Sequence, residues 1–157
     1  MTRSDVLAAL DASDVQVRSR LTVDSTESFG EWSAKDLLFH IASWQRFFGV
    51  TLRTRREADR EATASELLGQ PLDAAESARL LDADVDASNA YLFELYRDSD
   101  WNAGSRLWAE GFALLREEVG RLSDEELAAG EPLWRRIGSE SFTHIAGHLT
   151  GPEQVVG

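Results

Sequence analysis

The sequence predicts an all-α fold in which one domain is formed by a bundle of four or five amphipathic helices. Apolar residues recur at three- and four-residue intervals through the long stretches between turn signals, which is the period of a helix. The chain has only three prolines, and no segment alternates polar and apolar residues strictly enough to indicate a strand. Its 157 residues suit a single domain, which we expect to span 1–157.

The first two helices are predicted to begin near Ser4 and after Ser33. The first extends to about Leu21, although Asp14 interrupts its apolar stripe. Its predicted core residues are Leu7, Leu10, Val17 and Leu21. Ser33, followed three residues later by Asp36, resembles a capping box, in which both side chains accept hydrogen bonds from free amides of the first turn. The apolar face of this second helix carries Leu37, Ile41, Trp44, Phe48 and Leu52, and His40 lies beside it, so we expect His40 to point inward.

The middle of the chain is predicted to contain two further helices. Gly69-Gln70-Pro71 interrupts the pattern, so residues 56–78 are expected to form the end of the second helix and a loop. A helix ending near residues 98–100 follows, and one side of it carries Val85, Asn89, Leu92 and Tyr96. The next helix has seven-residue spacing typical of coiled coils, and its apolar residues are Trp101, Trp108, Phe112, Leu115, Val119 and Leu122.

The C-terminal part is predicted to form a short turn and one last helix. Ser123 with Glu126 begins the turn, Gly130 ends it, and Pro132 stands where proline is tolerated at a helix start. We expect the last helix to continue until Gly151-Pro152 stops it. Its inward-facing residues are predicted to be Trp134, Ile137, Ser141, His144, Ile145 and His148.

Composition excludes several classes of function. A formal net charge of −12 disfavours binding to nucleic acid, since such binding depends on clustered Lys and Arg. The arginines between residues 53 and 60 alternate with acids, so we expect a solvated helix face there. No apolar run is long enough to cross a membrane, and no signal peptide is apparent, so a cytoplasmic location is expected. Without cysteine, any metal ion must be held by imidazole or carboxylate.

The three histidines are the strongest candidates for a functional site. Residues four apart on a helix have Cβ atoms about 5–6 Å apart, so His144 and His148 can direct one nitrogen each toward a common point. His40, on the inward side of another helix, is the candidate third ligand. Three imidazoles with one open position are typical of a reactive metal site, whereas structural zinc sites are usually closed by four protein ligands. The alternative is a chance H-x-x-x-H pair whose rings bond to water or backbone.

Other residues are candidates for a second shell of contacts or for a pocket. Metal-bound histidines usually donate their second ring nitrogen to an acceptor, and Asp36 and Glu140 each lie one turn before a histidine. Asp36 is alternatively a helix cap and Glu140 a solvated acid. Asn89, the one polar residue on its stripe, either faces the site or satisfies a buried backbone group. Four aromatic residues either line an apolar pocket or belong to the core: Trp44, Phe48, Trp108 and Trp134.

The two histidine-containing segments resemble those of a known superfamily. Residues 32–44, WSAKDLLFHIASW, resemble the W-[ST]-x-[KR]-[DE]-L-L-x-H-[LI]-x-x-W segment of the DinB-like superfamily. Residues 142–149, FTHIAGHL, are similar to the final H-x-x-x-H-L helix of that superfamily. Residues 86–90, 96–98 and 122–127 resemble its actinobacterial members, so the resemblance covers almost the whole chain.

This resemblance implies a DinB-like four-helix bundle with additional short helices, often dimeric, in which His40, His144 and His148 bind zinc, nickel or iron. Members include thiol transferases that use bacillithiol or mycothiol, the mycothiol-dependent maleylpyruvate isomerase, and ClbS/DfsB-type proteins that protect against reactive metabolites. The expected function is that of a metal-dependent thiol S-transferase or hydrolase, which activates a low-molecular-weight thiol or water against a small electrophilic substrate. The alternative is a non-catalytic protective homodimer that binds metal or sequesters a ligand.

Overall fold

The computed structural model describes residues 1–130 and 132–150, and this part of the chain is all-α, as predicted. Outside the helices, the one bridge between extended residues in the described part joins Phe29 to Trp32. No helix within the described ranges combines the length and the apolarity needed to cross a membrane.

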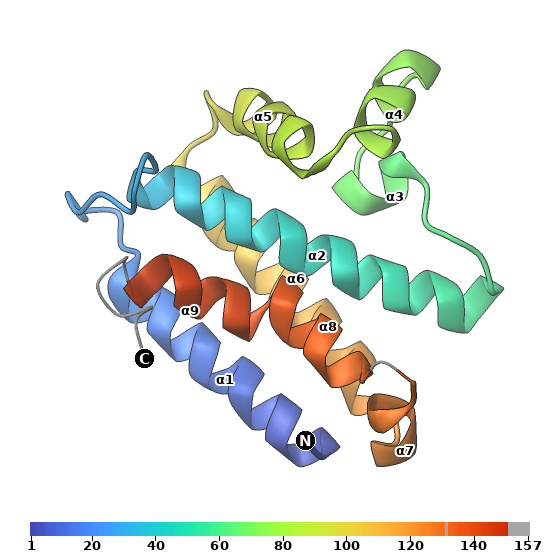
Figure 1. Cartoon of the computed structure of the whole chain (residues 1–157). Helices are drawn as coiled ribbons and strands as arrows, with labels where there is room; N and C mark the ends of the chain where they lie inside the picture. Colours follow the sequence, from blue (N-terminus) through green and yellow to red (C-terminus); the bar gives the residue numbers. More distant parts are fainter. Residues whose placement is uncertain (131, 151–157) are drawn as a thin grey trace.

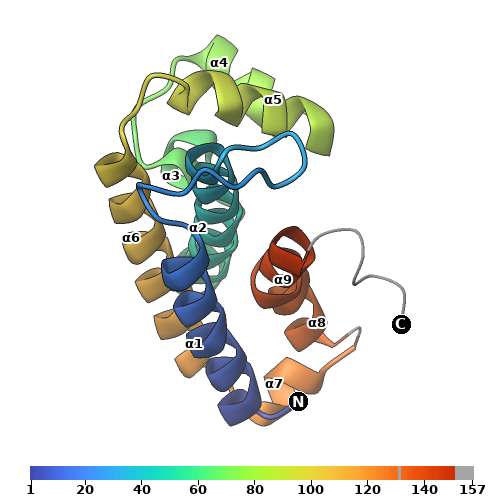
Figure 2. The ribbon, with the colours of Figure 1, turned by 90° about the vertical axis from the view of Figure 1, so that its left-hand side faces the viewer.

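Three long helices and one broken helix lie side by side along the molecule (Figures 1 and 2). They are α1 (Arg3–Arg20), α2 (Ala34–Ala58), α6 (Trp101–Gly120) and the pair α8 (Leu133–Glu140) and α9 (Phe142–Thr150). Helices α2 and α6 run in the same direction, because Gly104 at the start of α6 lies against Phe39, and the later Leu114 lies against Gly49. Helix α1 and the α8–α9 pair run in the opposite direction (Figure 1).

Because α2 and α6 are parallel, the chain must return along the length of α2 before α6 begins. Residues 59–100 make this return and include α3 (Ala64–Leu68), α4 (Ala74–Leu81) and α5 (Val85–Tyr96). The prediction of a loop after α2 was therefore wrong over α3 and α4. Each of these short helices has its own cap: Thr63 accepts a hydrogen bond from the Glu66 amide, and Asp73 accepts one from the Glu76 amide.

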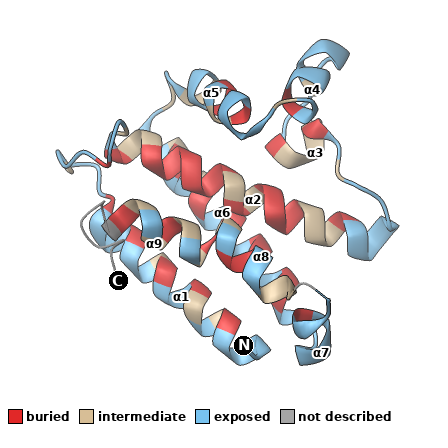
Figure 3. Cartoon of the chain, in the orientation of Figure 1, coloured by how far each residue is buried: buried red, intermediate tan, exposed pale blue. Residues whose placement is uncertain are grey.

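Helix α2 is buried on opposite faces, which makes it the central element of the fold (Figure 3). One face packs with α1, α6 and α9 through Leu37, Leu38 and Ile41. Its other face packs with α3, α4 and α5 through Phe47, which lies in one cluster with Leu68 and Leu92. A helix with two apolar faces must be covered on both, and the return segment supplies the second cover.

The last predicted helix is two helices, because Ser141 leaves the helical conformation with φ −138° and ψ −104°. The Ser141 hydroxyl donates to the carbonyl oxygen of Ile137, a bond that competes with the backbone ladder and bends helices. The bend also favours glycine at position 138, since a Cβ atom there would come within 2.8 Å of the Phe142 ring. The bend at Ser141 sets the direction of α9. The predicted stop at Gly151-Pro152 lies outside the described residues.

The short turn before α8 is confirmed as α7 (Asp124–Ala128), with Ser123 and Glu126 forming a complete capping box. Pro132 precedes the first residue of α8, as expected at a helix start.

Candidate metal centre

The start of α2 determines where His40 points. The Ser33 hydroxyl caps this helix by accepting a hydrogen bond from the Asp36 amide at 3.1 Å. The Asp36 carboxylate accepts from the Ser33 hydroxyl at 2.8 Å instead of from the Ser33 amide, so the predicted capping box is only half formed. His40 then lies two turns into the helix and is 6% exposed, which confirms that it points inward.

The other two histidines are one turn apart on α9, and both are half-buried. The Ser141 carbonyl accepts from the Ile145 amide at 2.8 Å and so begins the hydrogen-bond ladder of α9 at the bend. Ile145, 1% exposed, anchors this helix in the same core cluster as Leu37 and Leu38 of α2. The face of α9 that carries His144 and His148 is thereby held opposite His40.

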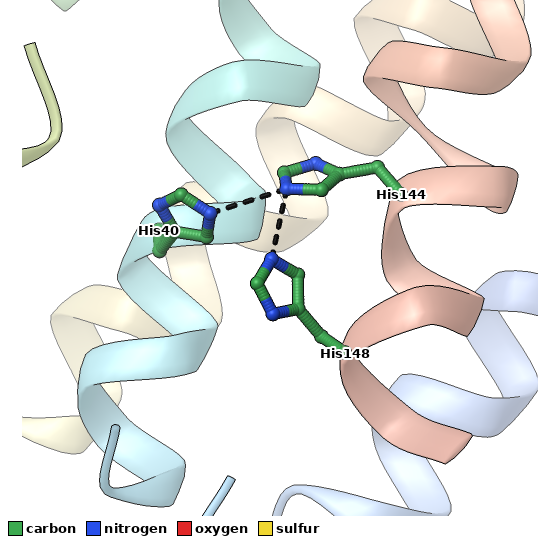
Figure 4. Close-up of side chains that lie close together, drawn as sticks. All are labelled: His40, His144 and His148. Atoms are coloured by element: carbon green, nitrogen blue, oxygen red, sulfur yellow. Dashed lines mark hydrogen bonds between the residues drawn. The ribbon is translucent and has the colours of Figure 1, made fainter. Parts of the chain in front are cut away.

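The three rings converge through their Nε2 atoms (Figure 4). His144 Nε2 lies 3.1 Å from His40 Nε2 and 2.9 Å from His148 Nε2. Two nitrogens that each lie about 2.1 Å from one ion stand about 3.0 Å apart at a right angle and about 3.4 Å apart at the tetrahedral angle. One candidate ligand atom from each histidine lies within 4.8 Å of the other two, so the cluster has the dimensions of a metal site.

Hydrogen bonds among the three rings cannot pair all of the Nε2 atoms. A neutral imidazole carries one proton, so His144 Nε2 presents either one N–H or one lone pair to its two neighbours. It can therefore form one good hydrogen bond, while the other pair of nitrogens, also about 3 Å apart, is left without one. A cation placed between the rings interacts with all three lone pairs at once.

The environment keeps these imidazoles neutral. Burial, reinforced by the charges of the other two histidines, lowers the pKa of His40 from 6.5 to about 3. Burial and the nearby His148 lower the pKa of His144 to about 4, and burial lowers the pKa of His148 as well. Only neutral imidazole ligates a metal, so the site is ready to bind one at neutral pH.

Neither of the two predicted acceptors bonds to a histidine ring. The Nδ1 atoms of His40 and His144 are buried and have no hydrogen-bond partner among the described residues. The Asp36 carboxylate instead accepts a hydrogen bond from the Ser33 hydroxyl. Asp36 also lines a small cavity beside His40. Glu140 is half-buried beside the histidines, and its burial raises the pKa of its carboxyl group. Neither acid fixes the orientation of a ring by a hydrogen bond.

A cleft of about 330 Å³, the histidine cleft, opens directly onto the cluster. All three histidines line it, and its other lining residues are Trp32, Trp44, Val85, Asn89, Ser139 and Glu140. The Trp32 ring stacks on the His40 ring with centroids 4.8 Å apart and an angle of 27° between the planes. Stacking restrains the His40 ring, which has no hydrogen bond at Nδ1 to do so. The cleft leaves space beside the three nitrogens for a further ligand.

Asn89 and Trp44, for each of which the sequence left two alternatives, line this cleft, and they are joined to each other. The Trp44 Nε1–H donates to Asn89 Oδ1 at 2.8 Å. Indole nitrogen is a donor only, so the amide oxygen must face Trp44 and the amide NH₂ must face elsewhere. No described residue accepts a hydrogen bond from that NH₂ group, so it can donate to water or to a ligand in the cleft.

Of the other three aromatic candidates, two lie in the core and one packs against it. Phe48 is 6% exposed and packs with Leu10 and Leu115, and Trp134 packs against the same cluster. Trp108 is 3% exposed and donates its Nε1–H to Asp14 at 2.7 Å, which explains the polar interruption in the stripe of α1. Helical spacing did not distinguish these residues from Trp44, because core and pocket aromatics have the same period.

Sequence reasoning missed Trp32 as a site residue, along with Val85 and Ser139. Trp32 precedes the α2 cap, outside any helical period, and its signals were its place beside the cap and as the first residue of the segment 32–44. Val85 begins α5 and Ser139 lies near the end of α8, so nothing local connects either of them with His40.

Comparisons of the chain with protein-family models, with curated proteins and with solved structures gave no match.

Proposed function

We propose that this chain is a DinB-like four-helix-bundle protein, a cytoplasmic homodimer that holds one divalent metal ion through His40, His144 and His148. We further propose that it is an enzyme, a thiol S-transferase or hydrolase that acts on a small electrophile. The observation that supports this best is the convergence of three neutral Nε2 atoms on the floor of a cleft. The parallel α2 and α6, flanked by two helices of opposite direction, and the resemblance of residues 32–44 and 142–149 to that superfamily support the family assignment.

The donor set fits such an ion. Imidazole nitrogen suits zinc, nickel and iron, and the chain has no thiolate to compete. When bound, a divalent ion held by three neutral ligands supplies Lewis acidity and lowers the pKa of a thiol or water in its open position. The chain has no cysteine, so the thiol must come from a low-molecular-weight cosubstrate such as mycothiol or bacillithiol.

The residues of the cleft have separate tasks in this proposal. Trp32 holds the ring of His40 by stacking on it. The Asn89 amide oxygen accepts a hydrogen bond from Trp44, so the amide N–H groups of Asn89 donate to an acceptor on the substrate. Glu140 is the carboxylate of the histidine cleft, and it takes up the proton that the thiol or water releases.

The first experiment measures metal content in protein purified without a metal-binding tag. Wild type should contain close to one divalent ion per chain. The double variant His144→Ala, His148→Ala should contain none, while Gly147→Ala, an exposed change on the same helix, should retain it. Unchanged metal content in the double variant would contradict the site.

The second experiment tests catalysis. A panel of electrophiles should be consumed when metal and a thiol or water are both present, and His40→Ala should abolish turnover without loss of helix content. Glu140→Gln should slow turnover with the metal content unchanged. Equal turnover by metal-free and metal-loaded protein would favour a non-catalytic, ligand-sequestering protein instead.

A further inference from the structure

A second hollow adjoins the histidine cleft at two shared lining residues. This outer hollow of about 400 Å³ is lined by Glu31, Trp32, Asn89, Ala90, Phe93 and Glu94. Trp32 and Asn89 line both spaces, so a ligand with one end at the histidines can extend past them into the outer hollow.

Aromatic rings form the apolar wall of the outer hollow. Phe93 is 40% exposed, and its ring meets the Trp32 ring at 6.3 Å with an angle of 67°. A large aromatic side chain left exposed beside a cleft offers contact area to a flat apolar group. The faces of such rings also carry the negative part of the ring quadrupole, which attracts cations.

Every charged side chain that lines the two hollows is acidic. Glu31 and Glu94 line the outer hollow, and Glu140 lines the histidine cleft. Among the described residues, no lysine or arginine lines either hollow. Arg97 reaches Glu94 at 3.4 Å, but both side chains are more than half exposed, and Arg136 lies over the Phe48 ring. Glu31 has no ion-pair partner in the described part of the chain.

These charges repel an anion that enters the outer hollow and attract a cation. The net charge of −12 on the whole chain acts in the same direction. A bound metal ion would attract an anion most strongly at the end of the ligand that reaches the histidines, because this attraction falls with distance and is screened by salt. A ligand at the inner end is indicated by His40, which is 6% exposed, lines the histidine cleft and belongs to the proposed metal site.

We propose that the cleft selects substrates whose distal part is flat, apolar and either uncharged or cationic, and that it discriminates against substrates whose distal part is anionic. This inference rests on the proposed function, since it places the reacting end of the substrate at the metal. Dianionic small acids are therefore expected to be poor substrates.

The test uses three benzohydroxamates that share one metal-binding group and differ only at the para position, which carries hydrogen, a trimethylammonium group or a carboxylate. Their Kd values are measured by calorimetry with zinc-loaded protein. The carboxylate is expected to bind at least about tenfold more weakly than the trimethylammonium compound, and added salt is expected to narrow the difference. The double variant Glu31→Gln, Glu94→Gln should reduce that ratio at least about threefold.

The control is the double variant Glu110→Gln, Glu125→Gln, which changes the net charge equally at exposed positions outside both hollows and should leave the ratio unchanged. Equal affinities for the three compounds, or a ratio unaffected by the Glu31 and Glu94 changes, would overturn this inference and leave the metal site intact. If protein with full zinc content bound none of the compounds, the open metal position would be wrong, and the proposed function would fail with it.

Discussion

Gly147 stands between the two histidines of α9, where a residue that favours helix would hold them more firmly. It is exposed, and a Cβ atom added there would meet nothing within 4 Å. Glycine inside a helix costs about 0.5–1 kcal/mol relative to alanine, because it loses more backbone freedom on folding. Gly147→Ala should therefore raise the free energy of unfolding by about that amount, measured by urea denaturation.

Gly138→Ala is the matched comparison on the neighbouring helix. Its Cβ atom would lie 2.8 Å from the Phe142 ring at the bend between α8 and α9. Displacing that ring should lower the free energy of unfolding by about 1–3 kcal/mol. If Gly138→Ala left stability unchanged or raised it, as is expected for Gly147→Ala, the bend would not depend on close packing at Gly138.

At the scale of elements, a buried carboxylate joins the C-terminal halves of α2 and α6. Glu118 of α6 is 2% exposed and accepts hydrogen bonds from Arg56 at 2.8 Å and from Arg53 at 3.3 Å, both on α2. The arginines at the end of α2 remain largely exposed, in line with the predicted solvated face, but two of them also pair with this buried carboxylate. The hydrogen bond from Arg56 lowers the pKa of Glu118, against the opposing effect of burial.

The lowered pKa has a defined consequence for stability. A carboxyl group whose pKa is lower in the folded chain than in the unfolded one stabilises the fold above the unfolded value of 4.5, and this stabilisation is lost as pH falls through the folded value. Glu118→Gln should lower the free energy of unfolding at pH 7 by roughly 1–3 kcal/mol. Its effect should shrink as the pH is lowered below 4.5, measured by denaturation at a series of pH values. Glu110→Gln, exposed on the same helix, should show neither change.

At the scale of the whole molecule, the proposed metal ion would join α2 and α9, two segments far apart in the sequence. Because an ion that binds only the folded chain stabilises it, chelation should lower Tm. Binding at about one hundred times Kd is worth roughly 2.7 kcal/mol, and in a chain of this size that corresponds to a shift of roughly 5–10 °C. Thermal denaturation at neutral pH with and without chelator measures it. His40→Ala should melt at the same temperature in both conditions, and an unchanged Tm in metal-loaded wild type would contradict the linkage.

The distribution of charge over the molecule argues against nucleic acid as a partner. Arg56 pairs with Glu118 and Arg60 pairs with Glu66, each at 2.8 Å, so acidic side chains offset part of the positive charge at the end of α2. With a net charge of −12, the protein should not shift duplex DNA in a gel at physiological salt. Micromolar or tighter binding at that salt would contradict the electrostatic argument.

The sequence by itself determined the features that depend on neighbouring residues. Helices α1, α2, α5 and α6, the caps at Ser33 and Ser123, and the inward direction of His40 were predictable, because helical periodicity and capping act within one or two turns. The spacing of His144 and His148 also predicted that they share one face of a helix.

Only the tertiary structure decided how these parts meet. The 3.1 Å approach of His40 and His144 spans 104 positions and depends on the bend at Ser141, which the apolar pattern passes through without interruption. Likewise, only tertiary packing decides that Trp44 lines the cleft whereas Phe48 lies in the core. The return segment places Asn89 in the same cleft as the histidines. Such contacts depend on distant surfaces that fit together, and a local pattern of apolar residues contains no information about its partner.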